Sequence, residues 1–267
     1  MNRRSARGLC GVWLWSILSV NALAVERFRV EVLDSRPQPR DHFVQGLEIA
    51  GGDLYVSSGL YGQSRLLRYD FNTGKLKNRI NLNRRFFAEG VTVLGEEVFQ
   101  LTWRNRRMLV YDRTSLTPQR QVSLPGEGWG LTNDGGALIY SDGSHRLFWM
   151  DPTSGRRLQT LNVTEAGVPV TRLNELEWID GQIWANVWRT DRIVVIDPTT
   201  GSVTASIDLT DILPIKERTP DTGVLNGIAR NPADGGIWIT GKRWPLMYRI
   251  EVLPTKENSE QFDLETR

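Results

Sequence analysis

Two groups of side chains, spaced alike in five similar segments of the chain, could together carry out acid–base chemistry. The first group opens each segment and changes identity from one segment to the next: Gln45, Glu89, Trp129, Asn174 and Asn226. The second group follows 14 residues later in the first four segments and 16 residues later in the fifth: Gly59, Trp103, Gly143, Trp188 and Lys242. Residues that differ between similar repeats are those that a shared structural role explains least.

Glu89 is the one acid of the first group, and Lys242 is the one base of the second. Desolvation raises the pKa of a carboxylate that tryptophans enclose, which suits a group that accepts and returns a proton near neutral pH. Simpler interpretations stay open. Each tryptophan could plug a channel, Asn174 and Asn226 could cap backbone groups, and Glu89 could form a structural ion pair with Lys242. The occurrence of these side chains together at equivalent positions favours a shaped pocket with Glu89 as its acid.

The segments that carry these residues begin 44, 40, 45 and 52 residues apart. Each has short runs rich in β-branched and aromatic residues, separated by Gly, Asp and Asn turns, which is typical of short antiparallel strands. Repeats of about 40 to 50 residues with four strands each are typical of propeller blades. We therefore predict an all-β fold, a single closed five-bladed β-propeller, whose last blade is completed by the first strand, Val25 to Leu33. The two groups would then form two rings around the axis, called here the first ring and the second ring.

Both ends of the chain are expected to lie outside the propeller. Three arginines, a mostly apolar run from Leu9 to Val20 and the sequence Ala22-Leu23-Ala24 predict a signal peptide over residues 1–24. An uncleaved membrane anchor is the alternative interpretation of this segment. We expect the catalytic propeller over residues 25–254 and a polar tail over residues 255–267. The expected protein is exported, periplasmic or secreted, and is a monomer that has no contact with the membrane after cleavage.

Composition and residue counts argue against several classes of protein. The predicted leader takes three arginines from 33 basic residues, which leaves 30 against 31 acidic ones, so a nucleic-acid partner is not expected. It also holds the one cysteine, Cys10, so no cysteine nucleophile is expected. His42 and His145 are too few and too scattered for a zinc site. Glu175 and Glu177 alternate with the first-ring residue of their strand, so we expect them to face away from it and to have a structural role.

Ten short motifs in order, from about residue 42 to 250, carry a resemblance to a known family: His42–Glu48, Ser58–Ser64, Phe86–Thr92, Gln100–Trp103, Gly126–Thr132, Tyr140–Ser144, Asn174–Glu177, Ala185–Trp188, Leu225–Ala229 and Thr240–Pro245. The chain resembles the glutamine cyclotransferase family, the propeller type known from plants and bacteria. It departs from the family pattern at Ala88, where glycine is frequent, and at Val44, where threonine is common.

The resemblance implies an activity, a substrate and a set of site residues. Members of this family cyclise peptides and proteins that begin with glutamine to pyroglutamyl products, release ammonia, and use no cofactor or catalytic metal. Glu89 stands at the position of the catalytic acid, and eight residues stand at pocket positions: Phe43, Gln45, Phe87, Trp103, Trp129, Asn174, Trp188 and Lys242. Of these, Gln45, Asn174 or Lys242 would hold the oxyanion, and the sequence does not separate them.

Two functions of other classes stay as alternatives. One is a metal-dependent, lactonase-like propeller hydrolase, in which Glu89, Asn174 and Asn226 would supply oxygen ligands to a divalent cation. The other is a non-catalytic binding propeller, in which the channel residues only plug the axis. Three tryptophan walls fit a dry pocket better than a hydrated cation site, and propellers serve many functions, so the motifs decide between these functions more than the fold does.

Overall fold

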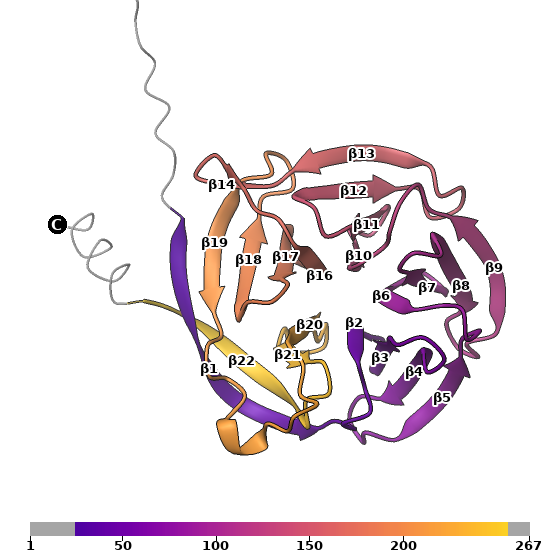
Figure 1. The fold of residues 1–267 in the computed structure, drawn as a ribbon, viewed down its shortest axis with the longest axis horizontal. Coiled ribbons are helices and arrows are strands. Elements are labelled where there is room, and N and C mark those ends of the chain that lie inside the picture. Colours follow the sequence, from indigo (N-terminus) through magenta and orange to yellow (C-terminus); the bar gives the residue numbers. More distant parts are fainter. Residues whose placement is uncertain (1–24, 256–267) are drawn as a thin grey trace, which may run out of the picture.

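The computed structural model describes residues 25–255, whose sheets are set around a central axis (Figure 1). The fold is all-β, as the sequence predicts. Within the described residues the one helical element is the short 3₁₀ helix η1 (Ile215–Glu217). Within residues 25–255 no helix has the length and apolar character needed to cross a membrane. The predicted signal peptide, 1–24, and residues 256–267 of the predicted tail lie outside the described residues.

Three sheets each take four consecutive strands, paired antiparallel with their chain neighbours. The first sheet consists of β2 (Val44–Ala50), β3 (Asp53–Ser58), β4 (Arg65–Asp70) and β5 (Leu76–Asn81). The second consists of β6 (Ala88–Leu94), β7 (Glu97–Thr102), β8 (Arg107–Asp112) and β9 (Pro118–Ser123). The third consists of β10 (Leu131–Asn133), β11 (Leu138–Ser141), β12 (Arg146–Met150) and β13 (Arg157–Asn162).

The remaining long strands form one sheet of eight, in the order β16-β17-β18-β19-β1-β22-β21-β20. Their bounds are β16 (Leu173–Ile179), β17 (Gln182–Val187), β18 (Arg192–Ile196), β19 (Val203–Asp208), β1 (Glu26–Pro37), β22 (Leu246–Pro254), β21 (Ile237–Gly241) and β20 (Leu225–Arg230). A separate hairpin, β14 (Thr164–Glu165) with β15 (Val168–Pro169), which the sequence did not predict, precedes β16.

Strand β1 accounts for the difference between this sheet of eight and the four-stranded units that the repeats predict. It has 12 residues, and its first part pairs in parallel with β19, from Glu26 beside Ala205 to Arg29 beside Asp208. From Phe28, beside Pro254, it also pairs antiparallel with β22 on its other edge, as far as Pro37 beside Leu246. The prediction that the first strand of the propeller lies beside the last strand is therefore confirmed, and the strand is long enough to join two neighbouring units as well.

Strands β2, β6, β10, β16 and β20 lie nearest the axis (Figure 1). Neighbouring inner strands pack so closely that two positions, Gly90 and Gly130, have no room for a side chain. A Cβ at Gly90 would lie 2.4 Å from the Leu131 backbone nitrogen, and one at Gly130 would lie 1.8 Å from the Asn174 backbone oxygen. The equivalent residue of β16 is Glu175, whose carboxylate accepts hydrogen bonds from the Leu47 nitrogen at 3.2 Å and the Ile228 nitrogen at 2.8 Å. Glu175 thus ties β16 to β2 and β20 across the axis.

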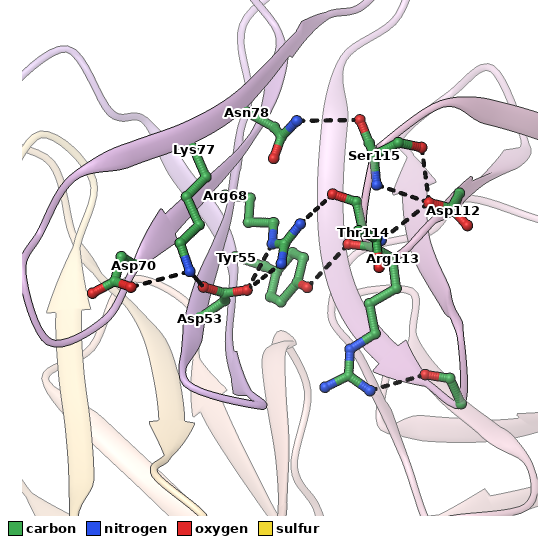
Figure 2. Close-up of polar contacts among 11 residues, drawn as sticks. Asp53, Tyr55, Arg68, Asp70, Lys77, Asn78, Asp112, Arg113, Thr114 and Ser115 are labelled. Carbon is green, nitrogen blue, oxygen red and sulfur yellow. Dashed lines mark hydrogen bonds and ion pairs between the residues drawn. The ribbon is translucent and has the colours of Figure 1, made fainter.

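Neighbouring sheets pack through clusters of buried apolar side chains and are also joined by polar contacts. One cluster, between the first and second sheets, includes Tyr55 and Val98. Figure 2 shows the polar contacts there: the Asp53 carboxylate accepts a hydrogen bond from Arg68 Nε at 2.7 Å, and Arg68 donates to the Thr114 carbonyl. The Tyr55 hydroxyl donates to the Arg113 carbonyl at 3.3 Å. Arg113 and Thr114 lie in the turn after β8, so these contacts join β3 and β4 of the first sheet to a turn of the second.

Candidate active site

All nine site residues named from the sequence line one cavity of about 330 Å³. Three more residues complete its wall, Arg189, Gly223 and Val224. Two larger hollows, of about 810 and 1010 Å³, lie elsewhere on the molecule, and none of the nine residues lines either of them. The structure therefore brings these nine residues together at one end of the inner strands; the repeats pointed to seven of them, and the resemblance added Phe43 and Phe87.

The inner strands deliver these side chains in pairs. Each first-ring residue stands at the beginning of an inner strand, and each second-ring residue follows the antiparallel strand beside it. Backbone hydrogen bonds hold the two ends together, from the Trp103 nitrogen to the Phe87 oxygen at 3.0 Å and from the Lys242 nitrogen to the Val224 oxygen at 3.0 Å. Antiparallel pairing thus places Phe43 and Phe87, just before β2 and β6, beside the ends of β3 and β7.

Strand pairing is irregular at the four polar first-ring residues, three of which line the cavity. The register shifts between Val44 and Gly46, between Ala88 and Val91, and between Leu173 and Leu176. These shifts enclose Gln45, Glu89 and Asn174, and a fourth encloses Asn226. Bulges of this kind re-aim a side chain beside active sites. The sequence predicted which residues share a ring but contained no signal for the bulges that direct them.

Glu89 is buried in the wall of the cavity, with 4% of its surface exposed. Burial raises the pKa of its carboxyl well above the usual range for a glutamate. The positive charge of Lys242 and a hydrogen bond from the Gln45 side chain oppose the rise, while the negative charge of Glu127 adds to it. Glu89 is therefore a carboxyl that holds its proton more readily than a surface glutamate does, which suits a group that takes up and returns a proton.

Lys242 is buried as deeply, with 6% of its surface exposed. Burial lowers the pKa of its ammonium group to about 8, and the nearby charge of Glu89 opposes that change. Its Nζ lies 5.1 Å from the centre of the Phe43 ring. Among the residues that the structure describes it forms no ion pair within 4.0 Å, so the structural Glu89–Lys242 pair that the sequence left open is not formed.

The three amides of the first ring have different surroundings. Asn226 donates to the Val44 carbonyl at 3.0 Å and to Gln45 Oε1 at 3.3 Å, so it lies behind Gln45 and does not line the cavity. This is the capping role that the sequence left open for Asn226. Asn174 Oδ1, which is buried, has no hydrogen-bond partner in the described part of the chain. Because buried polar atoms are normally satisfied, Asn174 is ready to bind a donor from a ligand.

Five of the twelve residues that line the cavity are aromatic, and one carboxylate holds two of them. Trp129 and Trp188 meet edge to face at 5.5 Å, and Phe87 and Trp103 meet at 5.6 Å. Glu127 accepts hydrogen bonds from both Trp103 Nε1 at 2.7 Å and Trp129 Nε1 at 3.2 Å. Sequence reasoning gave Glu127 no role, although it lies in the motif from Gly126 to Thr132. The possible signal was its place two residues before a ring tryptophan.

The axial carboxylates lie outside the cavity. Glu175 and Glu177 do not line it, as strand alternation predicts, and each accepts backbone hydrogen bonds instead. The first-ring glutamate alone brings a carboxylate into the cavity wall. Within residues 25–255 no cluster of three His, Cys, Asp or Glu side chains has a geometry that could hold a metal ion.

Comparisons with known proteins point in one direction. A family model described as "Glutamine cyclotransferase" matches residues 11–252. A glutaminyl-peptide cyclotransferase from Arabidopsis thaliana is 37% identical over 243 residues, which cover 87% of this chain and 74% of the relative. The crystal structure of a Myxococcus xanthus glutaminyl cyclase superposes with a TM-score of 0.80 at 31% identity, covering 87% of this chain and 100% of that one.

Proposed function

The chain belongs to the glutamine cyclotransferase family and is a glutaminyl-peptide cyclotransferase, and we propose that its reaction takes place in the cavity around Glu89. It converts the N-terminal glutamine of a peptide to pyroglutamate and releases ammonia. The single observation that supports this location is the convergence of a buried carboxyl, a buried ammonium group and three tryptophans on one small cavity.

The proposed reaction is an intramolecular aminolysis. The α-amine of the substrate attacks the δ-carbonyl carbon of its own glutamine side chain, so a C–N bond forms and a five-membered lactam closes. Glu89 accepts the proton that the amine loses and delivers it to the departing side-chain nitrogen, which leaves as ammonia when its C–N bond breaks. The enzyme is returned to its starting protonation state, and no other reactant is needed.

The other polar groups of the cavity have separate roles in this mechanism. Lys242 is a cationic donor without an ion pair among the described residues, and it would stabilise the negative charge that develops on the carbonyl oxygen. A donor of this kind contributes roughly 3 kcal/mol in well-studied enzymes. Gln45 is held by Asn226 and hydrogen-bonds Glu89, so it orients the carboxyl. Asn174 Oδ1 would accept an N–H of the substrate.

The aromatic walls would supply orientation. Tryptophans 103, 129 and 188 leave a cavity of about 330 Å³, which fits a folded glutamine side chain better than an extended peptide. If the walls hold the α-amine against the δ-carbonyl carbon, the two reacting groups do not have to find each other by random motion of the chain. Such orientation accounts for a large part of the rate of intramolecular reactions. The walls also exclude water, which would compete with the amine for the carbonyl carbon.

For the fold, we propose five blades. Four strands, β16 to β19, would form the fourth blade, and β20, β21, β22 and β1 would form the fifth. The parallel contact of β1 with β19 would be a bridge between these two blades. Five apolar clusters support this count, because each lies between two neighbouring units of four strands.

For the whole chain, we propose the arrangement that the sequence predicts. Residues 1–24 would be a signal peptide, residues 25–254 the catalytic domain and residues 255–267 a polar tail. The mature enzyme would act as a monomer outside the cytoplasm, in the periplasm or secreted, on exported peptides or proteins that begin with glutamine. The basic and apolar residues before Val25 support export.

Ammonia release from a dipeptide that begins with glutamine, with and without EDTA, tests the function. Release that survives EDTA and yields a pyroglutamyl product is the expected result. Release that EDTA abolishes would favour the metal-dependent alternative, and binding without release would favour the non-catalytic propeller. The Glu89→Gln variant, measured beside the parent protein, links the activity to the cavity.

A further inference from the structure

The five residues that directly follow the second ring are called here the rim, and three of them are arginines: Leu60, Arg104, Ser144, Arg189 and Arg243. Two of the arginines cover second-ring tryptophans. The Arg104 guanidinium lies 4.1 Å from the centre of the Trp103 ring, and that of Arg189 lies 4.5 Å from the centre of the Trp188 ring. The mouth therefore carries positive charge at fixed places.

Acidic neighbours neutralise two of these arginines. Arg104 lies 3.6 Å from Glu127, and Arg243 lies 3.4 Å from Asp221. Arg189 has no carboxylate within 4.0 Å and no side-chain hydrogen bond in the part of the chain that the structure describes. The Arg189 guanidinium lies over the face of Trp188 instead. Arg189 is thus the rim arginine whose guanidinium N–H groups have no acceptor among the described residues. Two parallel N–H groups of a guanidinium form the donor pair that a carboxylate binds best.

Arg189 also differs from the other two in its access to the cavity. It lines the cavity, whereas Arg104 and Arg243 do not. The other charged lining residues, Glu89 and Lys242, are buried, while Arg189 is exposed. The backbone of Arg189 has a positive φ of 65°, and that of Arg243 has one of 59°. This conformation belongs to the loop geometry that both blades share, so Arg243 is a control matched in backbone as well as in side chain.

We propose that Arg189 binds a carboxylate of the residue that follows the N-terminal glutamine and so selects the peptides that the enzyme cyclises fastest. This inference rests on the proposed placement of the glutamine in the cavity. Successive Cα atoms are about 3.8 Å apart, so with the glutamine enclosed the second residue lies at the mouth, within reach of the rim. The carboxylate is either an acidic side chain at the second position or the C-terminal carboxylate of a dipeptide.

Three peptides separate the two sources of the carboxylate. Gln-Asn-amide is neutral beyond the amine, Gln-Asp-amide adds a side-chain carboxylate of nearly the same shape, and Gln-Asn with a free C-terminus adds the α-carboxylate. For the parent enzyme we expect kcat/KM to be about two- to fivefold higher for at least one of the acidic peptides, the range of exposed ion pairs. The preference should fall as salt is raised from 0.01 to 0.15 M ionic strength, because salt screens exposed charges.

The variants test whether Arg189 causes the preference. In Arg189→Gln the ratio of acidic to neutral peptide should fall to one, and in Arg189→Glu it should fall below one. Arg104→Gln and Arg243→Gln should each keep the ratio of the parent enzyme. An equal ratio in the parent enzyme and in Arg189→Gln would overturn the inference, as would a parent enzyme without a salt-sensitive preference, a result that needs no variant to fold.

Failure of the underlying function has a different signature. If the parent enzyme turns over the neutral peptide and Glu89→Gln does not, the placement of the reaction holds, and the ratios decide on Arg189 alone. If none of the three peptides is cyclised, or if Glu89→Gln cyclises them as fast as the parent enzyme, the placement of the glutamine is wrong and the inference is overturned with it.

Discussion

Two sets of buried glutamates lie within a few strands of each other and differ in what surrounds their carboxyl groups. Glu175, on the axis, is fully buried, and two backbone N–H groups from different strands donate to it. Glu89, at the mouth, is nearly as buried, but it faces a cavity and its recorded hydrogen-bond partner is the Gln45 side chain. Burial raises the pKa of both carboxyls well above the usual range.

A raised pKa therefore does not distinguish a catalytic carboxyl from a structural one. The distinction lies in the partners, because backbone donors fix Glu175 in place while Glu89 keeps a side open to a ligand. Glu177 belongs with Glu175, since it accepts a hydrogen bond from the Arg230 nitrogen at 2.8 Å. In the proposed mechanism, burial at the mouth serves proton transfer, whereas burial on the axis holds the inner strands together.

The largest expected effect is on the activity of Glu89→Gln. The amide keeps the size of the side chain but removes the proton acceptor, so kcat should fall by about 10²- to 10⁴-fold, the usual contribution of general acid–base catalysis. Unfolding in urea should show no loss of stability, because the amide avoids the cost of burying a charge. Turnover of a Gln-initiated dipeptide within a factor of ten of the parent rate would contradict the role given to Glu89.

Glu175→Gln should show the opposite behaviour. The amide nitrogen cannot accept a hydrogen bond, so one of the two backbone N–H groups loses its partner inside the protein. We expect the free energy of unfolding to fall by about 1–3 kcal/mol, the cost of an unsatisfied buried donor. Urea titration measures this loss, and kcat of the folded variant should stay within about twofold of the parent value. A variant of parent stability that has lost its activity would move Glu175 into the catalytic machinery.

Glu127→Gln tests the carboxylate that holds two tryptophans of the cavity wall. Both indole N–H groups donate to the same oxygen, Oε2, so a glutamine with its amide oxygen in that place can hold both tryptophans, and the negative charge is what the change removes. KM should stay within about twofold of the parent value, because the ion pair that is lost, with Arg104, is partly exposed. The negative charge of Glu127 also raises the pKa of Glu89, so its removal should move the acidic limb of kcat to lower pH. A purely structural Glu127 would leave that limb where it is in the parent enzyme.

The smallest expected effect is the dependence of stability on pH. Burial raises the pKa values of Glu48, Glu175 and Glu177 in the folded state, so stability is greatest below the pKa of the unfolded chain and is lost as pH rises through the folded values. The melting temperature should therefore fall by a few degrees between pH 6 and pH 9. In Glu175→Gln the fall should be smaller. A melting temperature that rises over this interval would show that these carboxyls are ionised throughout.

The sequence predicted which residues line the cavity better than it predicted which contacts hold them in place. Repeats place Glu89 at the start of an inner strand and Lys242 just after the strand that pairs with another inner strand, because the repeat period fixes where each strand begins and ends. The role of Glu127 has no such signal, since the two tryptophans that it joins belong to neighbouring sheets and the contact arises only when the sheets pack. The parallel pairing of β1 with β19 was missed for the same reason, because it depends on the length of a strand and the distance between units.

The pH dependence of kcat at saturating peptide tests the central claim most directly, because kcat reports the groups of the enzyme–substrate complex. The account predicts an acidic limb well above pH 4.5, the ordinary value for a glutamate, and its absence from the residual activity of Glu89→Gln. It also predicts a decline above about pH 8, where Lys242 loses its charge. A parent kcat that stays constant down to pH 4.5, or an acidic limb that survives unchanged in Glu89→Gln, would contradict the assignment of Glu89 as the proton-transfer group.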